Sequence, residues 1–362
     1  MIVWGDFDKT SSAAVVTVNI DLVGAMASSQ SLISKDGDAP IDASGFDHYR
    51  IQRQLSGKVS ITALAVFGTY RYSHGDFSGA LMAWREALGN EGERLNHAVL
   101  HGLCGTALNE LGDYNSALEH FDEALRADPM FAEARNNRGV SLRRLGRVPE
   151  AISEFSAAIQ LRPRYALAYA NRGYAHKVEE EYDAAMKDYS AALALVADDP
   201  RIWMNRAVLN ETLDRFDEAI ADFSVVISLR PADAQALRLR AVAYRRAGQI
   251  QQAIKDYSAA IRLAPLQPDL YQNRAIAQLA AGEPEKARRD LNEAINLKPS
   301  YVLEYANRAL LCQRMGDFVC AADDANRFIS LMDRTDQVQL QLLHEIELRV
   351  LGICGSHAVR RR

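Results

Sequence analysis

Charged residues recur along this chain at a spacing that would join them in pairs. Six arginines follow one another at intervals of 34 residues, and an aspartate or glutamate stands sixteen residues after each of them. Guanidinium and carboxylate groups form charge-assisted, often bidentate hydrogen bonds, so these residues suit salt bridges. The expected pairs are Arg138 with Glu154, Arg172 with Asp188, Arg206 with Asp222, Arg240 with Asp256, Arg274 with Asp290, and Arg308 with Asp324.

Two further positions of the same series support the pairing, because both partners are absent there together. Phe67 and Cys104 stand where the arginine would be, and Ala83 and His120 stand where the acid would be. We therefore interpret the pairs as structural contacts between two helices. The alternative is a ladder of arginines that binds anionic ligands.

A second series lies one residue before the arginines and consists mostly of asparagine. A side-chain amide offers both a donor and an acceptor, which is what a peptide unit needs. We expect these amides either to bind the backbone of an extended peptide or to hydrogen-bond a neighbouring helix and solvent. The members are Asn137, Asn171, Asn205, Asn273 and Asn307, and Leu239 interrupts them.

Basic residues gather a few positions after the asparagines, where the same helices are expected to end. Cations at a helix C-terminus are stabilised by the helix dipole, which would explain them without a ligand. Alternatively, they form a basic surface suited to an acidic segment or a C-terminal carboxylate. These residues are Arg143, Arg144, Lys177, Arg245, Arg246 and Arg314.

Around Cys104, one of the two positions without an arginine, lie side chains of the types that bind metals in other proteins. Helical spacing puts His97, His101 and Cys104 on one side, and the sixteen-residue offset places His120 opposite Cys104. Three imidazoles and a thiolate would suit tetrahedral zinc. A neutral replacement of the ion pair within the core is the simpler interpretation, so we predict neither a metal nor a cofactor.

The elements that position these residues come from a repeat of fixed length. Alanine occupies eight equivalent positions, and the residue four positions after the alanine is in most repeats large and aromatic. Glycine stands five positions before the alanine, except in the two repeats that have Glu180 or Asp214 there. Small residues let two antiparallel helices approach closely, and glycine supplies the positive φ needed to leave the first helix. Units of this length bury their apolar faces only against neighbouring units. The alanines are Ala80, Ala117, Ala151, Ala185, Ala219, Ala253, Ala287 and Ala321.

This pattern resembles the tetratricopeptide repeat, although that family usually has leucine where the six arginines stand. The resemblance implies an all-α fold, an α-solenoid of antiparallel helix pairs in a right-handed superhelix, with a groove lined by the first helices. A capping helix is expected at 336–351, followed by a tail at 352–362. The glycine and arginine content of the units resembles bacterial members of the family. The eight repeats are 61–94, 98–131, 132–165, 166–199, 200–233, 234–267, 268–301 and 302–335.

The resemblance also places the asparagines and the basic residues in the groove. There the asparagines are similar to the ladder in the repeat domain of O-linked N-acetylglucosamine transferase, whose amides hold an extended peptide. The implied function is a non-enzymatic protein–protein interaction scaffold with a protein or peptide partner of acidic character. The alternatives are a nucleic-acid-binding or a metal-stabilised regulatory repeat protein.

Composition excludes several other classes of protein. The 362 residues carry a net charge of −5, which gives no general attraction to nucleic acid. No apolar run is long enough to span a membrane, and no phosphate-binding loop, metalloprotease motif or nucleophile elbow occurs. The cysteines have no framework spacing, so we expect buried thiols, including Cys312 and Cys320 on the two helices of one repeat.

The first 60 residues do not fit the repeat, and we expect an irregular extension there. Residues 13–27 are apolar and end in a small-residue pattern that suggests a signal peptide. Asp6 and Asp8 precede this run, whereas a secretory signal begins with positive charge. We therefore predict a cytoplasmic location, with export as the alternative.

Overall fold

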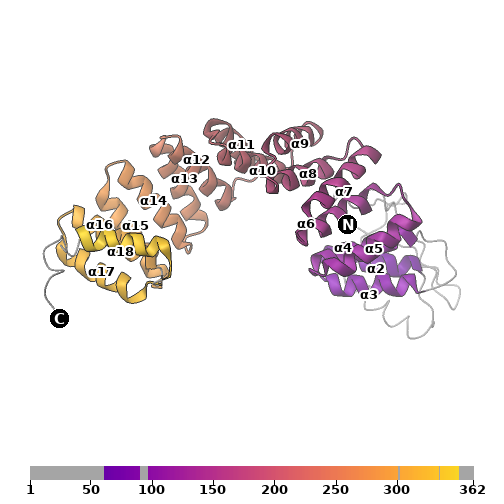
Figure 1. Cartoon of the computed structure of the whole chain (residues 1–362), viewed down its shortest axis with the longest axis horizontal. Coiled ribbons are helices and arrows are strands. Elements are labelled where there is room, and N and C mark those ends of the chain that lie inside the picture. The colour runs from indigo at the N-terminus through magenta and orange to yellow at the C-terminus, as the bar shows by residue number, and fades with distance from the viewer. Residues whose placement is uncertain (1–60, 90–96, 301, 334, 350–362) are drawn as a thin grey trace, which may run out of the picture. The chain divides into compact units, whose positions relative to one another are not determined.

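The computed structural model describes residues 61–89, 97–300, 302–333 and 335–349 of the chain (Figure 1). The N-terminal extension with its apolar run, the C-terminal tail and Cys354 lie outside these ranges. Every regular element within them is an α-helix. None of these helices combines the length and the apolarity that crossing a bilayer requires.

The helices follow one another as antiparallel pairs, and one further helix stands at the end. A short turn joins the two helices of each pair. The pairs are α2 (Ile61–Ser73) with α3 (Phe77–Leu88), α4 (His97–Glu110) with α5 (Tyr114–Ala127), α6 (Ala132–Arg144) with α7 (Val148–Leu161), α8 (Ala166–Val178) with α9 (Tyr182–Leu195), α10 (Pro200–Thr212) with α11 (Phe216–Leu229), α12 (Ala234–Arg246) with α13 (Ile250–Leu263), α14 (Pro268–Ala280) with α15 (Pro284–Leu297), and α16 (Val302–Arg314) with α17 (Phe318–Leu331).

The turn inside each pair needs one residue in the left-handed region, as the glycine series predicts. Six turns use glycine, and the remaining two place Glu180 and Asp214 at φ 61° and 59°. The next residue donates its backbone N–H back into the first helix, as Arg147 does to the Leu142 carbonyl over 2.9 Å. The left-handed residue and this backbone hydrogen bond together end the first helix, and the second helix then runs antiparallel to it.

The core lies where the two helices of a pair meet. All eight alanines of the series are buried, and the aromatic side chains four positions later fill the space beside them. Gly139 shows how close the approach is, because a Cβ atom there would lie 2.7 Å from the Phe155 ring. The small-residue positions are therefore steric requirements of the pair.

The chain divides into two compact units after Leu195, and each is a serial stack. The N-terminal unit contains α2 to α9, and the C-terminal unit contains α10 to α18 (Gln337–Arg349). Within a unit, each second helix contacts the first helix of the next pair, as α5 contacts α6 and α13 contacts α14. The sequence-based prediction of an all-α solenoid is thus confirmed.

First helices of successive pairs also contact one another, as α4 and α6, α6 and α8, and α12 and α14 do. We call the surface formed by α4, α6 and α8 the first-helix face of the N-terminal unit. At the other end of the chain, α18 packs on α16 with Ile346 buried and Leu342 and Leu343 half-buried. The last repeat is therefore capped, as expected for a terminal repeat.

Candidate functional site

The six arginines of the series lie on first helices and contact the acids on the second helices of the same pairs. Arg172 is typical, since its Nε and Nη2 atoms each donate to the Asp188 carboxylate over 2.8 Å. The five aspartates are buried, and Glu154 accepts from Arg138 over 3.0 Å. These hydrogen bonds raise the pKa of Arg172, Arg240, Arg274 and Arg308.

Five of these arginines have a second contact, sixteen residues back, that the sequence spacing did not predict. Arg172 Nη1 donates to the Ser156 hydroxyl over 3.0 Å, and Arg240 reaches Ser224 over 2.9 Å in the same way. Arg138 reaches Asp122, Arg274 reaches Ser258, and Arg308 reaches Asn292. One guanidinium therefore joins the second helices of two consecutive pairs. This arrangement favours a structural role for the series over a ligand-binding one.

The asparagines of the second series are half-buried on the first helices, and several amides already have partners in the protein. Asn137 donates to the Thr106 hydroxyl over 3.1 Å, and Asn171 donates to Asn136 Oδ1 over 2.9 Å. Asn273 donates to the Asp269 carbonyl of its own helix over 2.7 Å. The first two contacts join neighbouring helices and the third lies within one helix, and all three leave the amides fewer groups for a peptide.

Asn205 and Asn307 differ from the other members of the series. The Asn307 side chain lies beside the Glu304 carboxylate, whose oxygens have no well-formed hydrogen bond, while Asn205 has no side-chain hydrogen bond to another described residue. Both belong to the C-terminal unit, whereas Asn137 and Asn171 belong to the N-terminal unit.

The basic residues fall into two groups according to their partners. Arg246 is engaged within the protein, since it bridges Glu211 over 3.0 Å, contacts Asp214 and covers the Phe216 ring. Arg144 and Arg314 are exposed at the ends of α6 and α16.

Arg143 differs from these residues because it is half-buried and has no carboxylate partner among the described residues. Its guanidinium carbon lies 4.7 Å from the centre of the Tyr174 ring, and its Nε is buried without a hydrogen bond. Burial and the neighbouring Arg144 lower the pKa of Arg143. The site therefore holds a positive charge that is poorly compensated.

Two tyrosine side chains lie near this arginine. The Tyr189 hydroxyl is buried without a hydrogen-bond partner, and burial raises its pKa. Tyr174 and Tyr189 interact electrostatically with Arg143 from α8 and α9. Lys177 lies half-buried on α8 one turn beyond Tyr174. We call Arg143, Tyr174 and Tyr189 the Arg143 cluster. Arg245 repeats part of it in the C-terminal unit, beside the Tyr257 hydroxyl.

The histidine and cysteine set does not come together as a metal site in the described residues. His101 Nδ1 lies 3.1 Å from His120 Nδ1, but His97 and Cys104 do not join them within ligand distance. Burial and the adjacent His101 lower the pKa of His120 to about 4, and burial raises the pKa of Cys104 to about 12. This set fits the interpretation of a neutral replacement for the ion pair.

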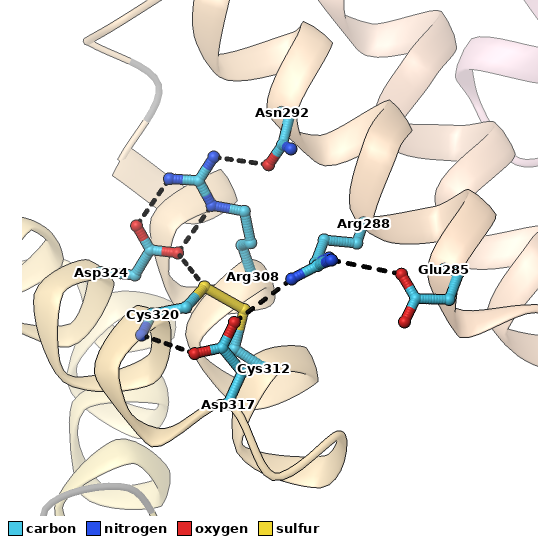
Figure 2. Close-up of a disulfide and its surroundings, with 8 residues drawn as sticks. All are labelled: Glu285, Arg288, Asn292, Arg308, Cys312, Asp317, Cys320 and Asp324. Atoms are coloured by element: carbon cyan, nitrogen blue, oxygen red, sulfur yellow. Dashed lines mark hydrogen bonds and ion pairs between the residues drawn. A yellow bond between two sulfur atoms is a disulfide. The ribbon is translucent and has the colours of Figure 1, made fainter.

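The expectation of buried thiols at Cys312 and Cys320 is wrong, because the two side chains form a disulfide (Figure 2). Their Sγ atoms are 2.13 Å apart and their Cα atoms 5.9 Å apart. Cys312 lies in the last turn of α16 and Cys320 in the first turn of α17, on either side of the Gly316 turn. The turn brings the two residues opposite one another. The remaining described cysteine, Cys104, is a buried free thiol.

Three sequence models of the tetratricopeptide repeat match this chain, over residues 103–166, 173–243 and 234–266. No curated protein matches it.

Solved structures of repeat proteins resemble the fold. A chain of the APC/C hetero-tetramer Cut9–Hcn1 aligns with 84% of this chain and 60% of its own, at 16% identity and a TM-score of 0.50. A tetratricopeptide repeat protein from Parabacteroides merdae aligns over 66% and 93%, at 22% identity and a TM-score of 0.49. YrrB, described as having an unusual peptide-binding site, aligns over 52% and 96%, at 20% identity and a TM-score of 0.47.

Proposed function

Because this chain is a tetratricopeptide repeat protein, we propose that it is a scaffold that binds an acidic, extended segment of a partner protein. The family and its fold are typical of scaffolds without catalytic activity, and its members bind protein partners. We place the binding surface on the first-helix face of the N-terminal unit, around Arg143.

A contrast between two kinds of arginine supports this choice. Arg172 has a bidentate carboxylate partner and a serine partner inside the fold, so its charge is satisfied. Arg143 lies on α6, the first helix of the preceding pair, is half-buried, and has neither kind of partner among the described residues. A buried or half-buried cation without an anion is costly, so the site gains free energy when an anion binds.

The geometry of the Arg143 cluster suits a carboxylate side chain. A guanidinium presents N–H donors in a planar fork that matches a carboxylate, and the Tyr174 ring holds it from one side. Val140 of α6 and Thr106 of α4 occupy the positions equivalent to Tyr174, and the half-buried Asn137 donates to Thr106. An extended segment crossing these helices would therefore meet small polar and apolar groups before it reaches the arginine.

Fluorescence polarisation with labelled decaglutamate and decaglutamine peptides tests this function. Decaglutamate should bind the full chain more tightly, and its affinity should fall as salt rises. Charge-assisted hydrogen bonds contribute roughly 1.5–3 kcal/mol, so Arg143→Ala should weaken binding roughly 10- to 100-fold. Arg144→Ala is the matched control, because it removes an exposed cation beside the same site.

Two results would contradict the proposed function. The first is equal binding of the two peptides. The second is an equal loss of affinity in Arg143→Ala and Arg144→Ala, which would indicate a diffuse charge effect. Binding of a single-stranded DNA oligonucleotide more tightly than decaglutamate would favour the nucleic-acid alternative instead.

A further inference from the structure

A second chemically distinctive place lies in the C-terminal unit, around the disulfide. The Sγ atoms of Cys312 and Cys320 and a carboxylate oxygen of Asp324 all lie within 4.8 Å of one another. Among the described residues, no other group of histidine, cysteine and acidic side chains converges in this way. We propose that these three residues form a redox-gated site for a thiophilic divalent cation, with zinc as the best-fitting ion.

The distance between two of the three ligand atoms already matches that of a tetrahedral site. Zinc binds sulfur at about 2.3 Å and carboxylate oxygen at about 2.1 Å, which places those two ligand atoms about 3.6 Å apart. Cys320 Sγ lies 3.8 Å from Asp324 Oδ2. The two sulfurs are the atoms that must separate, and they do so when the disulfide is reduced. Cys320 is half-buried, so water can reach the fourth position.

The charges around the site balance when a divalent cation is present. Two thiolates and the Asp324 carboxylate carry three negative charges, and Arg308 donates to both Asp324 oxygens over 2.7 Å (Figure 2). A divalent cation together with the Arg308 guanidinium would neutralise this set. Neutrality matters because Cys312 and Asp324 are buried, where an uncompensated charge is costly.

The surrounding contacts hold the ligands in place independently of the disulfide. Asp317 caps α17 by accepting the Cys320 backbone N–H over 3.1 Å, and Arg288 of α15 donates to Asp317 over 3.2 Å (Figure 2). Arg308 is fixed from the other side by Asn292. Hydrogen bonds of this kind orient metal ligands before the metal binds.

Other repeats show that the fold does not require a disulfide at this position. His176 and Asn210 occupy the place of Cys312 in two earlier repeats, and each faces the buried acid of its own pair, Asp188 or Asp222. The acid therefore faces this position in these two repeats as it does in the last one. The last repeat alone combines it with two cysteines.

The gate is thiol–disulfide exchange with a dithiol reductant. The reductant transfers two electrons to the S–S bond and becomes a disulfide itself, and Cys312 and Cys320 each gain one proton. Cation binding then displaces both thiol protons, because thiolates are the ligands. In an oxidising compartment the bond stays closed and the cation is excluded, whereas a reducing compartment opens the site.

Cobalt titration of the full chain tests the site, because Co²⁺ substitutes for zinc and gives thiolate-to-metal absorption. The chain is reduced with a phosphine, freed of metal and titrated without oxygen. One equivalent of Co²⁺ should produce the absorption band, Zn²⁺ should displace it, and the oxidised chain should show no band. Cys320→Ser should abolish the band, while Cys104→Ser and Cys354→Ser should retain it.

A double variant tests the carboxylate ligand without leaving an unpaired charge. Arg308→Gln with Asp324→Asn removes both members of the ion pair, and cobalt affinity should fall at least tenfold while the far-ultraviolet circular dichroism stays helical. The site is refuted if the reduced wild-type chain shows no band, or if the band survives in Cys320→Ser. Peptide binding at Arg143 lies in the other unit and has its own assay, so either inference can fail without the other.

Discussion

Glu304 occupies a position in α16 where the repeat has no place for a charge. Its side chain is fully buried, and its carboxylate oxygens lack a well-formed hydrogen bond, although Asn307 approaches them. The equivalent residues of six earlier repeats are buried and apolar: Leu100, Ala134, Ala168, Ile202, Ala236 and Leu270. Replacing Glu304 with a neutral residue should therefore stabilise the protein.

The size of this effect follows from the pKa of Glu304. Burial, and then the nearby charge of Asp269, raise that pKa from 4.5 to about 7. One pKa unit corresponds to about 1.4 kcal/mol, so the ionised carboxylate costs the folded state about 3 kcal/mol relative to the protonated one. Glu304→Gln keeps the shape and fixes the neutral form.

The sign of the pH dependence is set by which state binds more protons. Between pH 4.5 and pH 7 the unfolded chain has an ionised Glu304, while the folded chain keeps the proton. Stability relative to the Gln variant therefore falls as pH rises through this window, and the loss is complete above pH 7. Glu304→Gln should be nearly neutral at pH 4 and should stabilise by about 3 kcal/mol at pH 8.

Urea unfolding of the wild type and the variant, followed by circular dichroism at pH 4 and pH 8, measures this difference. Comparing the two proteins at each pH cancels the contributions of the other acids. A gain in the variant that is the same at both pH values would refute the reasoning, because it would mean that Glu304 has an ordinary pKa.

Two further predictions concern the repeat framework. Asp222→Ala removes the carboxylate from the partly buried Arg206 guanidinium and should lower the free energy of unfolding by ~3–5 kcal/mol. The double variant Arg206→Leu with Asp222→Leu should restore the melting temperature. An unchanged melting temperature in the single variant would contradict the structural role of the pair. Glu180→Gly should stabilise by ~1 kcal/mol, because φ is 61° there, and Glu180→Ala should give no such gain in the same thermal melts.

The helix pairs and the arginine–acid spacing could be predicted because a repeat turns one structural requirement into a column of residues. A single residue then deviates visibly, as Glu180 does in the glycine column, and the structure shows the same backbone conformation there. Glu304 deviates equally clearly from an apolar column, so this buried acid could have been found by the same comparison.

Contacts between columns were harder to predict, since they depend on side-chain conformation. The Arg172–Ser156 contact joins different repeats, and Asn171 meets Asn136 rather than a residue of its own series. The disulfide depends on the oxidation state, which the sequence does not encode. Arg143 was one of six basic residues expected near the ends of first helices, and its burial and the lack of an acid among the described residues distinguish it from the exposed Arg144 and Arg314.

Because five guanidinium groups of the arginine series each contact two consecutive helix pairs, these contacts bear on how such a chain can change in length. Arg172 meets its acid sixteen residues ahead and its serine sixteen residues behind, in the preceding pair. Whichever complete repeat precedes it can offer a polar side chain at that same place. Whole repeats can therefore be gained or lost without leaving a guanidinium group unpaired. An insertion of part of a repeat at such a junction would move the guanidinium group away from its polar partner in the preceding pair.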